Sequence, residues 1–186
     1  QMNTFGIVFL AALVLATVTR LVLASRHLSH VRAHRDRVPD AFTSAIGLAA
    51  HQKAADYTCA KTSFAKLDLV VGVLVVLALT FGGGLQWLHD VSAAWAAEGI
   101  LRGLLLIALT GILMTFIDLP FDLYRTFVIE QRFGFNKTTP GLFFADLCKS
   151  LLLGAALMLP LAALILWLIR ELGAYWWVYA WAATVA

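Results

Sequence analysis

The chain has 186 residues; 61% of them are hydrophobic and 13% are charged, with 14 Lys and Arg against 11 Asp and Glu. This composition, with a mean hydropathy of +0.85, excludes an ordinary soluble globular protein. The apolar residues form long continuous runs rather than an alternating pattern, so an all-α integral membrane protein is predicted rather than a transmembrane barrel. The net charge of +3 is explained by Lys and Arg that flank the apolar runs, and implies no nucleic-acid partner.

The first predicted membrane span covers residues 3–24. About 22 residues of helix extend roughly 33 Å, which is enough to cross the hydrocarbon core. The arginines follow this run instead of preceding it, so we expect a retained anchor rather than a cleaved signal peptide.

Residues 25–66 form a long polar segment in which Lys and Arg outnumber Asp. By the positive-inside rule this segment is predicted to be cytoplasmic, with the N-terminus outside. Val38-Pro39-Asp40 should divide it, and the composition of residues 41–66 predicts a helix that lies on the membrane or packs on other cytoplasmic elements.

Three further apolar runs and one partial run follow. Gly82-Gly83-Gly84 lie near the outer end of the second span, and Glu98 and Arg102 are spaced for an i,i+4 ion pair at the start of the third. The last run ends after too few residues to span a membrane. The expected spans after the first are residues 67–88, 100–118 and 140–170, with 175–186 as the start of a fifth.

Residues 119–139 connect the third and fourth spans and are predicted to be cytoplasmic. Leu119-Pro120 is expected to end one helix and to start a short amphipathic one, which Gly134 and Asn136 should stop. Thr139-Pro140 then supplies a hydroxyl N-cap followed by proline at the first helical position. The whole chain, 1–186, is therefore predicted to be one membrane domain: four transmembrane helices, the start of a fifth, and amphipathic cytoplasmic helices.

Charged and polar residues gather at the predicted cytoplasmic boundary of the third and fourth spans. Charge at a membrane boundary is costly unless it finds a partner, so these residues are candidates for one polar network. Such a network could fix helix ends or could form a polar rim around a substrate opening; Asp122 and Arg125 are spaced for a local pair. The candidates are Asp118, Asp122, Arg125, Glu130, Arg132, Asn136, Lys137, Asp146 and Lys149.

Three histidines, His27, His30 and His34, would share one face of a helix. Three imidazoles on one face could hold zinc, although the same residues also suit a basic helix beside the membrane. The sequence contains no His-Glu-x-x-His, the helical arrangement that sets two ligands and a base around one zinc ion. We therefore expect no complete catalytic or metal site in this chain.

Two motifs carry a family resemblance. The first is Leu-Pro-Phe-Asp-Leu-Tyr-Arg-Thr-Phe-Val-Ile-Glu-Gln-Arg-Phe-Gly-Phe-Asn-Lys-Thr-Thr-Pro at residues 119–140, followed by Phe143, Asp146 and Lys149. The second is His-Gln-Lys-Ala-Ala-Asp-Tyr-Thr-x-Ala-Lys at residues 51–61. Together they resemble the N-terminal membrane region of Ste24-type CAAX prenyl proteases, integral-membrane zinc metallopeptidases of the M48 family, over essentially the whole chain.

The resemblance implies a helical membrane chamber whose zinc site faces the cytoplasm. In that family two histidines of a His-Glu-x-x-His helix and a later glutamate hold the zinc, and none of these residues is present here. Zinc is therefore expected only in a full-length protein, and the chain alone should be catalytically incomplete. The implied partners are the lipid bilayer, a C-terminal catalytic region and a peptide or prenylated-peptide substrate, without nucleic acid.

The second motif also resembles the bacterial branch of the family, so a bacterial inner membrane is the expected location. The alternative hypothesis is a self-contained membrane scaffold or transport protein that lacks protease activity. What the gene encodes after Ala186 would separate the two.

Overall fold

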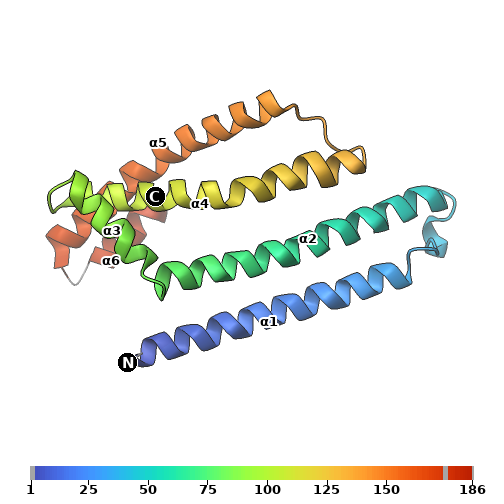
Figure 1. The fold of residues 1–186 in the computed structure, drawn as a ribbon, viewed down its shortest axis with the longest axis horizontal. Helices are drawn as coiled ribbons and strands as arrows, with labels where there is room; N and C mark the ends of the chain where they lie inside the picture. The colour runs from blue at the N-terminus through green and yellow to red at the C-terminus, as the bar shows by residue number, and fades with distance from the viewer. Residues whose placement is uncertain (1–2, 174–175, 186) are drawn as a thin grey trace. The chain divides into compact units, whose positions relative to one another are not determined.

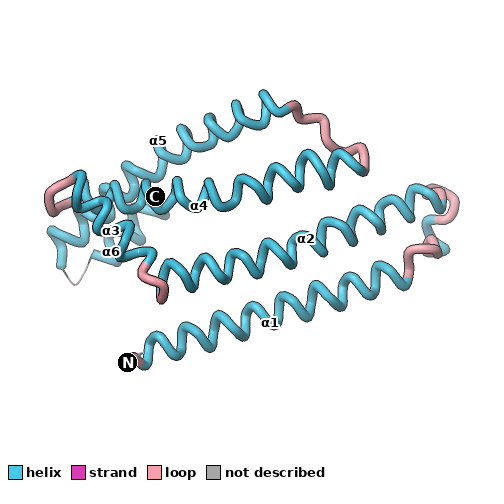
Figure 2. The backbone as a smooth tube through the Cα atoms, viewed as in Figure 1, coloured by secondary structure: helices cyan, strands magenta, loops and turns pink. Residues whose placement is uncertain are grey.

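The computed structural model describes residues 3–173 and 176–185, which form helices joined by short connections, without a strand in these ranges (Figure 2). The predicted all-α membrane class is confirmed: four helical stretches of this part of the chain are long and apolar enough to cross a membrane. The helices in chain order (Figure 1) are α1 (Thr4–Ala33), α2 (Leu48–Thr80), α3 (Gly84–Trp95), α4 (Ile100–Tyr124), α5 (Pro140–Leu172) and α6 (Trp176–Val185).

The chain divides into two compact units. One contains residues up to 82 together with 120–137, and the other contains residues 83–119 and those from 138 onward. In the first unit α1 and α2 lie side by side and antiparallel, so that the end of α1 is beside the start of α2 (Figure 1). Near the other end of this pair Phe9 contacts Phe81, with ring centroids 6.0 Å apart.

In the second unit α4 and α5 approach closely at Gly103. A Cβ atom built on this glycine would lie 2.8 Å from Leu166 Cδ1, so a larger residue would push the leucine aside. The predicted Glu98–Arg102 pair is present at 3.7 Å. Helix α6 packs on α5 and occupies most of the predicted start of a fifth span, of which residues 175 and 186 lie outside the described residues.

Helix ends follow the expected capping chemistry. Asn3 accepts a hydrogen bond from the Gly6 amide at 2.8 Å and starts α1. Thr139 accepts from the Leu142 amide at 3.3 Å and starts α5 with Pro140 in its first turn, which confirms the second start signal. Gly134 has φ 73° and ends the helical stretch before it, as predicted.

The prediction that a helix ends at Leu119-Pro120 is wrong. Helix α4 runs through Pro120 to Tyr124 and continues as six residues of π-helix, Arg125–Glu130. Proline removes one backbone donor, but Phe121 and Tyr124 in the following turn both pack on Phe64 of α2 and hold this turn helical.

The predicted limits of the second span and of the helix before it also change. No helix starts at residue 41, because Asp40–Phe42 form a short 3₁₀ turn and α2 begins after Gly47. From Leu48 the helix continues from the polar segment into the apolar run and ends at Thr80, not at residue 88. Gly83, at φ 77°, makes the turn, and the residues after it form α3.

Candidate functional site

The candidate site is built on the polar N-terminal half of α2, residues 48–68. This half carries the whole motif at residues 51–61, and within the first unit it contacts two other segments. One is the end of α1 with the turn that follows it, and the other is residues 121–135. We call these contacts the charged junction and the aromatic junction.

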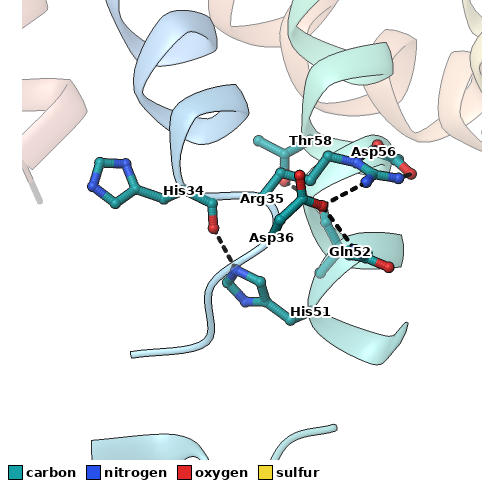
Figure 3. Close-up of polar contacts among 8 residues, drawn as sticks. His34, Arg35, Asp36, His51, Gln52, Asp56 and Thr58 are labelled. Atoms are coloured by element: carbon teal, nitrogen blue, oxygen red, sulfur yellow. Dashed lines mark hydrogen bonds and ion pairs between the residues drawn. The ribbon is translucent and has the colours of Figure 1, made fainter. Parts of the chain in front are cut away.

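The charged junction consists of Arg35, Asp36, Gln52 and Asp56 (Figure 3). The Arg35 guanidinium donates from Nε to Asp56 Oδ1 at 2.7 Å and from Nη2 to Asp56 Oδ2 at 2.8 Å, a bidentate pair. Its Nη1 also donates to Asp36 Oδ1 at 2.9 Å, and Gln52 Nε2 donates to the same carboxylate oxygen at 2.7 Å. These bonds fasten the turn after α1 to two successive turns of α2.

The charged junction lies in the polar segment, outside the apolar run that starts at residue 67. Hydrogen bonds from the Arg35 guanidinium hold the pKa of the Asp56 carboxyl below its usual range, and the charge of Arg132 acts in the same direction. The same hydrogen bonds with Asp56 raise the pKa of Arg35. Both groups are therefore ionised at neutral pH, so the contact is a charged pair.

The aromatic junction begins at Tyr57, one residue after Asp56. Its ring lies edge-on to Phe133 and to Phe135, with centroids 5.5 and 4.8 Å away and interplanar angles of 70° and 65°. The Lys53 ammonium lies 5.3 Å from the Phe135 ring centroid, and the Lys61 ammonium lies 5.7 Å from that of Tyr57. A lysine of α2 thus lies over each of these two rings, Phe135 and Tyr57.

Further along α2 the aromatic junction continues through Phe64 and ends at an ion pair. Phe64 stacks on Tyr124, with centroids 4.8 Å apart, and contacts Phe121 at 5.8 Å. Arg125 then donates from Nη2 to Asp68 Oδ2 at 3.3 Å, and its Nη1 lies 3.2 Å from Asp122 Oδ1.

The residues of α2 that make these contacts, Tyr57, Phe64 and Asp68, are spaced i, i+7, i+11 and share one helical face. Their partners are residues of the motif at 119–140. Through Tyr57 and Lys53, the motif at 51–61 therefore packs against the motif at 119–140, which is far away in the sequence.

Two of the candidate network residues, Asp122 and Arg125, contact each other across one helical turn. The Asp122–Arg125 pair is confirmed, and the structure adds Asp68 to it. Asp68 carried a usable signal, because it is a carboxylate at the edge of an apolar run and needs a partner there. The Arg35–Asp56 pair carried no such signal, since both residues lie in a segment rich in charge.

The other candidates make local contacts. Asp146 and Lys149 pair at 3.7 Å within one helix turn of α5. Asn136 Nδ2 donates to Gln131 Oε1 at 2.9 Å, and its backbone amide and that of Phe135 donate to the Glu130 carbonyl.

Three candidates remain. Arg132 lies 5.7 Å from the Phe133 ring centroid. Asp118 and Lys137 form no ion pair with any residue that the structure describes.

The histidines proposed as low-priority zinc ligands are not arranged as a metal site. The rings of His30 and His34 are 4.2 Å apart, but His34 Nδ1 contacts the His30 carbonyl at 2.9 Å. His51 Nε2 contacts the His34 carbonyl at 2.9 Å, beside the charged junction (Figure 3). In residues 3–173 and 176–185, no group of three or more His, Cys, Asp or Glu side chains is placed to hold a metal ion.

Four apolar helices long enough to span a membrane, with polar ends that two packed motifs join, define a class: a helical integral membrane protein. Residues 27–186 match the family model for the CAAX prenyl protease N-terminal region, which is described as five membrane helices. The chain belongs to this family and corresponds to the N-terminal membrane region of Ste24-like CAAX prenyl proteases.

Curated relatives agree with this assignment. The CAAX prenyl protease 1 homolog of Caenorhabditis elegans is 34% identical over 171 residues, which cover 90% of this chain and 38% of the relative. The Homo sapiens homolog is 33% identical over 121 residues, or 61% of this chain and 25% of the relative. The chain therefore spans less than half the length of these relatives.

The crystal structure of S. mikatae Ste24p superposes with a TM-score of 0.88 at 21% identity. The superposition covers 96% of this chain and 43% of Ste24p. At this level of identity the match shows a common fold.

Proposed function

We propose that this chain is the chamber-forming membrane part of a zinc metalloendopeptidase that cleaves prenylated or other membrane-associated peptides. The observation that carries the proposal is the packing of the motif at 51–61 on the motif at 119–140, in a chain that belongs to the CAAX prenyl protease N-terminal family. The chain contains no His-Glu-x-x-His, so the zinc and the groups that activate water would come from a C-terminal region. The chain alone would be inert.

The proposal includes an orientation. Lys and Arg are concentrated in residues 25–66 and 119–139, so these segments would face the cytoplasm and the N-terminus would lie outside. The charged and aromatic junctions would then lie at the cytoplasmic end of the helices, where the zinc-bearing region would attach. The relatives named above are eukaryotic, so the bacterial inner membrane expected from the sequence is not included in the proposal.

The test starts with the source gene beyond the codon for Ala186. We expect a continuing reading frame that encodes a His-Glu-x-x-His helix and a later glutamate. The full-length product should cleave a farnesylated CAAX peptide, a metal chelator should abolish the cleavage, and residues 1–186 alone should give none.

A stop codon at Ala186 would overturn the proposal and favour a self-contained scaffold or transport protein. Zinc-dependent cleavage by residues 1–186 would contradict the claim that the chain alone is inert.

A further inference from the structure

A single hydrogen bond marks the level at which the α1–α2 pair leaves the apolar part of the membrane. Lys66 Nζ donates to Ser25 Oγ at 3.0 Å. The apolar run of α1 ends just before Ser25, and that of α2 starts just after Lys66. Because the two helices are antiparallel (Figure 1), both apolar runs end at the level of this bond, and we place the boundary between hydrocarbon and headgroups there.

Immediately beyond this level, α1 presents cations to its surroundings. Arg26 and Arg32 are both exposed, and they lie within the last two turns of α1. We call these two arginines, with Lys66 of the neighbouring α2, the cationic end of α1. Arg32 is seven residues beyond Ser25, or roughly 10 Å along the helix, so its long side chain can reach back to the headgroups.

Among the residues that the structure describes, no carboxylate forms an ion pair with the cations of this end. In residues 3–82 each carboxylate pairs with an arginine outside the cationic end, at distances of 2.7 to 3.9 Å. The pairs are Asp36 and Asp56 with Arg35, Asp40 with Arg37, and Asp68 with Arg125. Arg26, Arg32 and Lys66 therefore have no carboxylate partner within the described part of the chain.

We infer that the cationic end of α1 binds the headgroup of an anionic phospholipid in the leaflet that meets this end of the α1–α2 pair. Each Lys or Arg near a membrane surface contributes about 1 kcal/mol of attraction to anionic lipid. The apolar surface of α1 directly below is free to take acyl chains, since Val18, Val22 and Leu23 are each more than half exposed. Because the cations lie directly beside exposed apolar surface, this site suits a lipid, which has both an anionic headgroup and acyl chains, better than a soluble anion.

The test uses native mass spectrometry of the chain in a neutral detergent, with equal amounts of dioleoylphosphatidylglycerol and dioleoylphosphatidylcholine. We expect the wild-type chain to retain phosphatidylglycerol in preference. The double variant Arg26→Gln/Arg32→Gln should lose this preference by about tenfold or more, given about 1 kcal/mol per cation.

Two matched variants separate charge at this site from charge in general. Arg26→Lys/Arg32→Lys keeps the charge and should keep the preference. Arg37→Gln/Arg170→Gln removes the same charge from exposed positions outside the cationic end and should also keep it. Arg26 and Arg32 are exposed, so every variant should melt at the wild-type temperature.

Three results would overturn the inference. The first is equal retention of the two lipids by the wild-type chain, which needs no variant. The second is an equal loss of preference in the Arg37→Gln/Arg170→Gln control. The third is displacement of phosphatidylglycerol by excess glycerol 1-phosphate, because a soluble anion would then suffice without acyl chains.

Discussion

The two junctions of α2 hold the same helix by different forces. At the charged junction, a bidentate pair between Arg35 and Asp56 joins side chains that are 37% and 45% exposed. At the aromatic junction, the rings of Tyr57 and Phe64 contact four other rings, and Arg125 adds ion pairs with Asp68 and Asp122. The charged junction joins α2 to the end of α1, the helix that precedes it in the chain. The aromatic junction joins α2 to a segment more than 50 residues later in the chain.

This difference predicts an order of importance. Exposed ion pairs contribute little, typically below 1 kcal/mol, because water screens them and long side chains lose freedom when they pair. Ring pairs add about 0.5–1.5 kcal/mol each beyond the apolar area that they bury. We therefore expect the aromatic junction to contribute most of the stability of the first unit, and the charged junction to set the direction of the turn after α1.

The largest effect is expected for Tyr57→Ala. This change removes two edge-to-face contacts and should destabilise the chain by about 2 kcal/mol, measured by thermal unfolding in detergent. Phe42→Ala is the matched control, because Phe42 is more than half exposed in the turn between α1 and α2. A loss no larger than that of the control would refute the assigned order.

A smaller effect is expected for Arg125→Ala, which removes the contacts to Asp68 and Asp122. Arg125 and Asp68 are 38% and 36% exposed, so we expect a loss of about 1 kcal/mol, again read from thermal unfolding. A double-mutant cycle with Asp68→Asn should give a coupling energy clearly above zero.

The control for Arg125 is Arg37→Ala, whose pair with Asp40 at 3.9 Å is almost fully exposed and should be near neutral. Additive losses in the Arg125–Asp68 cycle would mean that the pair has no energetic role.

The smallest effect is expected at the charged junction and should depend on pH. Arg35 lowers the pKa of Asp56 in the folded chain, so the stabilisation is present above the unfolded pKa of the carboxyl. It is lost as the pH falls through the lower, folded pKa. Thermal unfolding of the wild type against Asp56→Asn should show the wild-type advantage at neutral pH and its disappearance in acid.

Arg35→Lys tests the geometry of the same pair. Lysine keeps the charge but cannot make the bidentate contact, so it should give a weaker pH dependence than arginine. An unchanged acid profile in Arg35→Lys would show that charge alone is sufficient.

Much of the fold follows from local patterns. The continuous apolar runs predicted the spanning helices, and Thr139-Pro140 and Gly134 predicted a helix start and a helix end that the structure contains. These features depend on residues close in sequence, where hydropathy, capping and backbone preferences act directly. The Asp122–Arg125 pair was predictable for the same reason, since its residues are one helical turn apart.

The other features of the fold and of the candidate site depend on contacts between segments that are far apart in the sequence. The local sequence predicts that a helix ends at Pro120. Instead, Phe121 and Tyr124 pack on Phe64, and α4 continues through the proline. Asp68 was recognisable as a carboxylate in need of a partner, yet its sequence neighbours do not indicate Arg125. Tyr57 meets Phe133 and Phe135 only after the chain has folded back on α2, because ring packing needs surfaces that no short stretch of sequence contains.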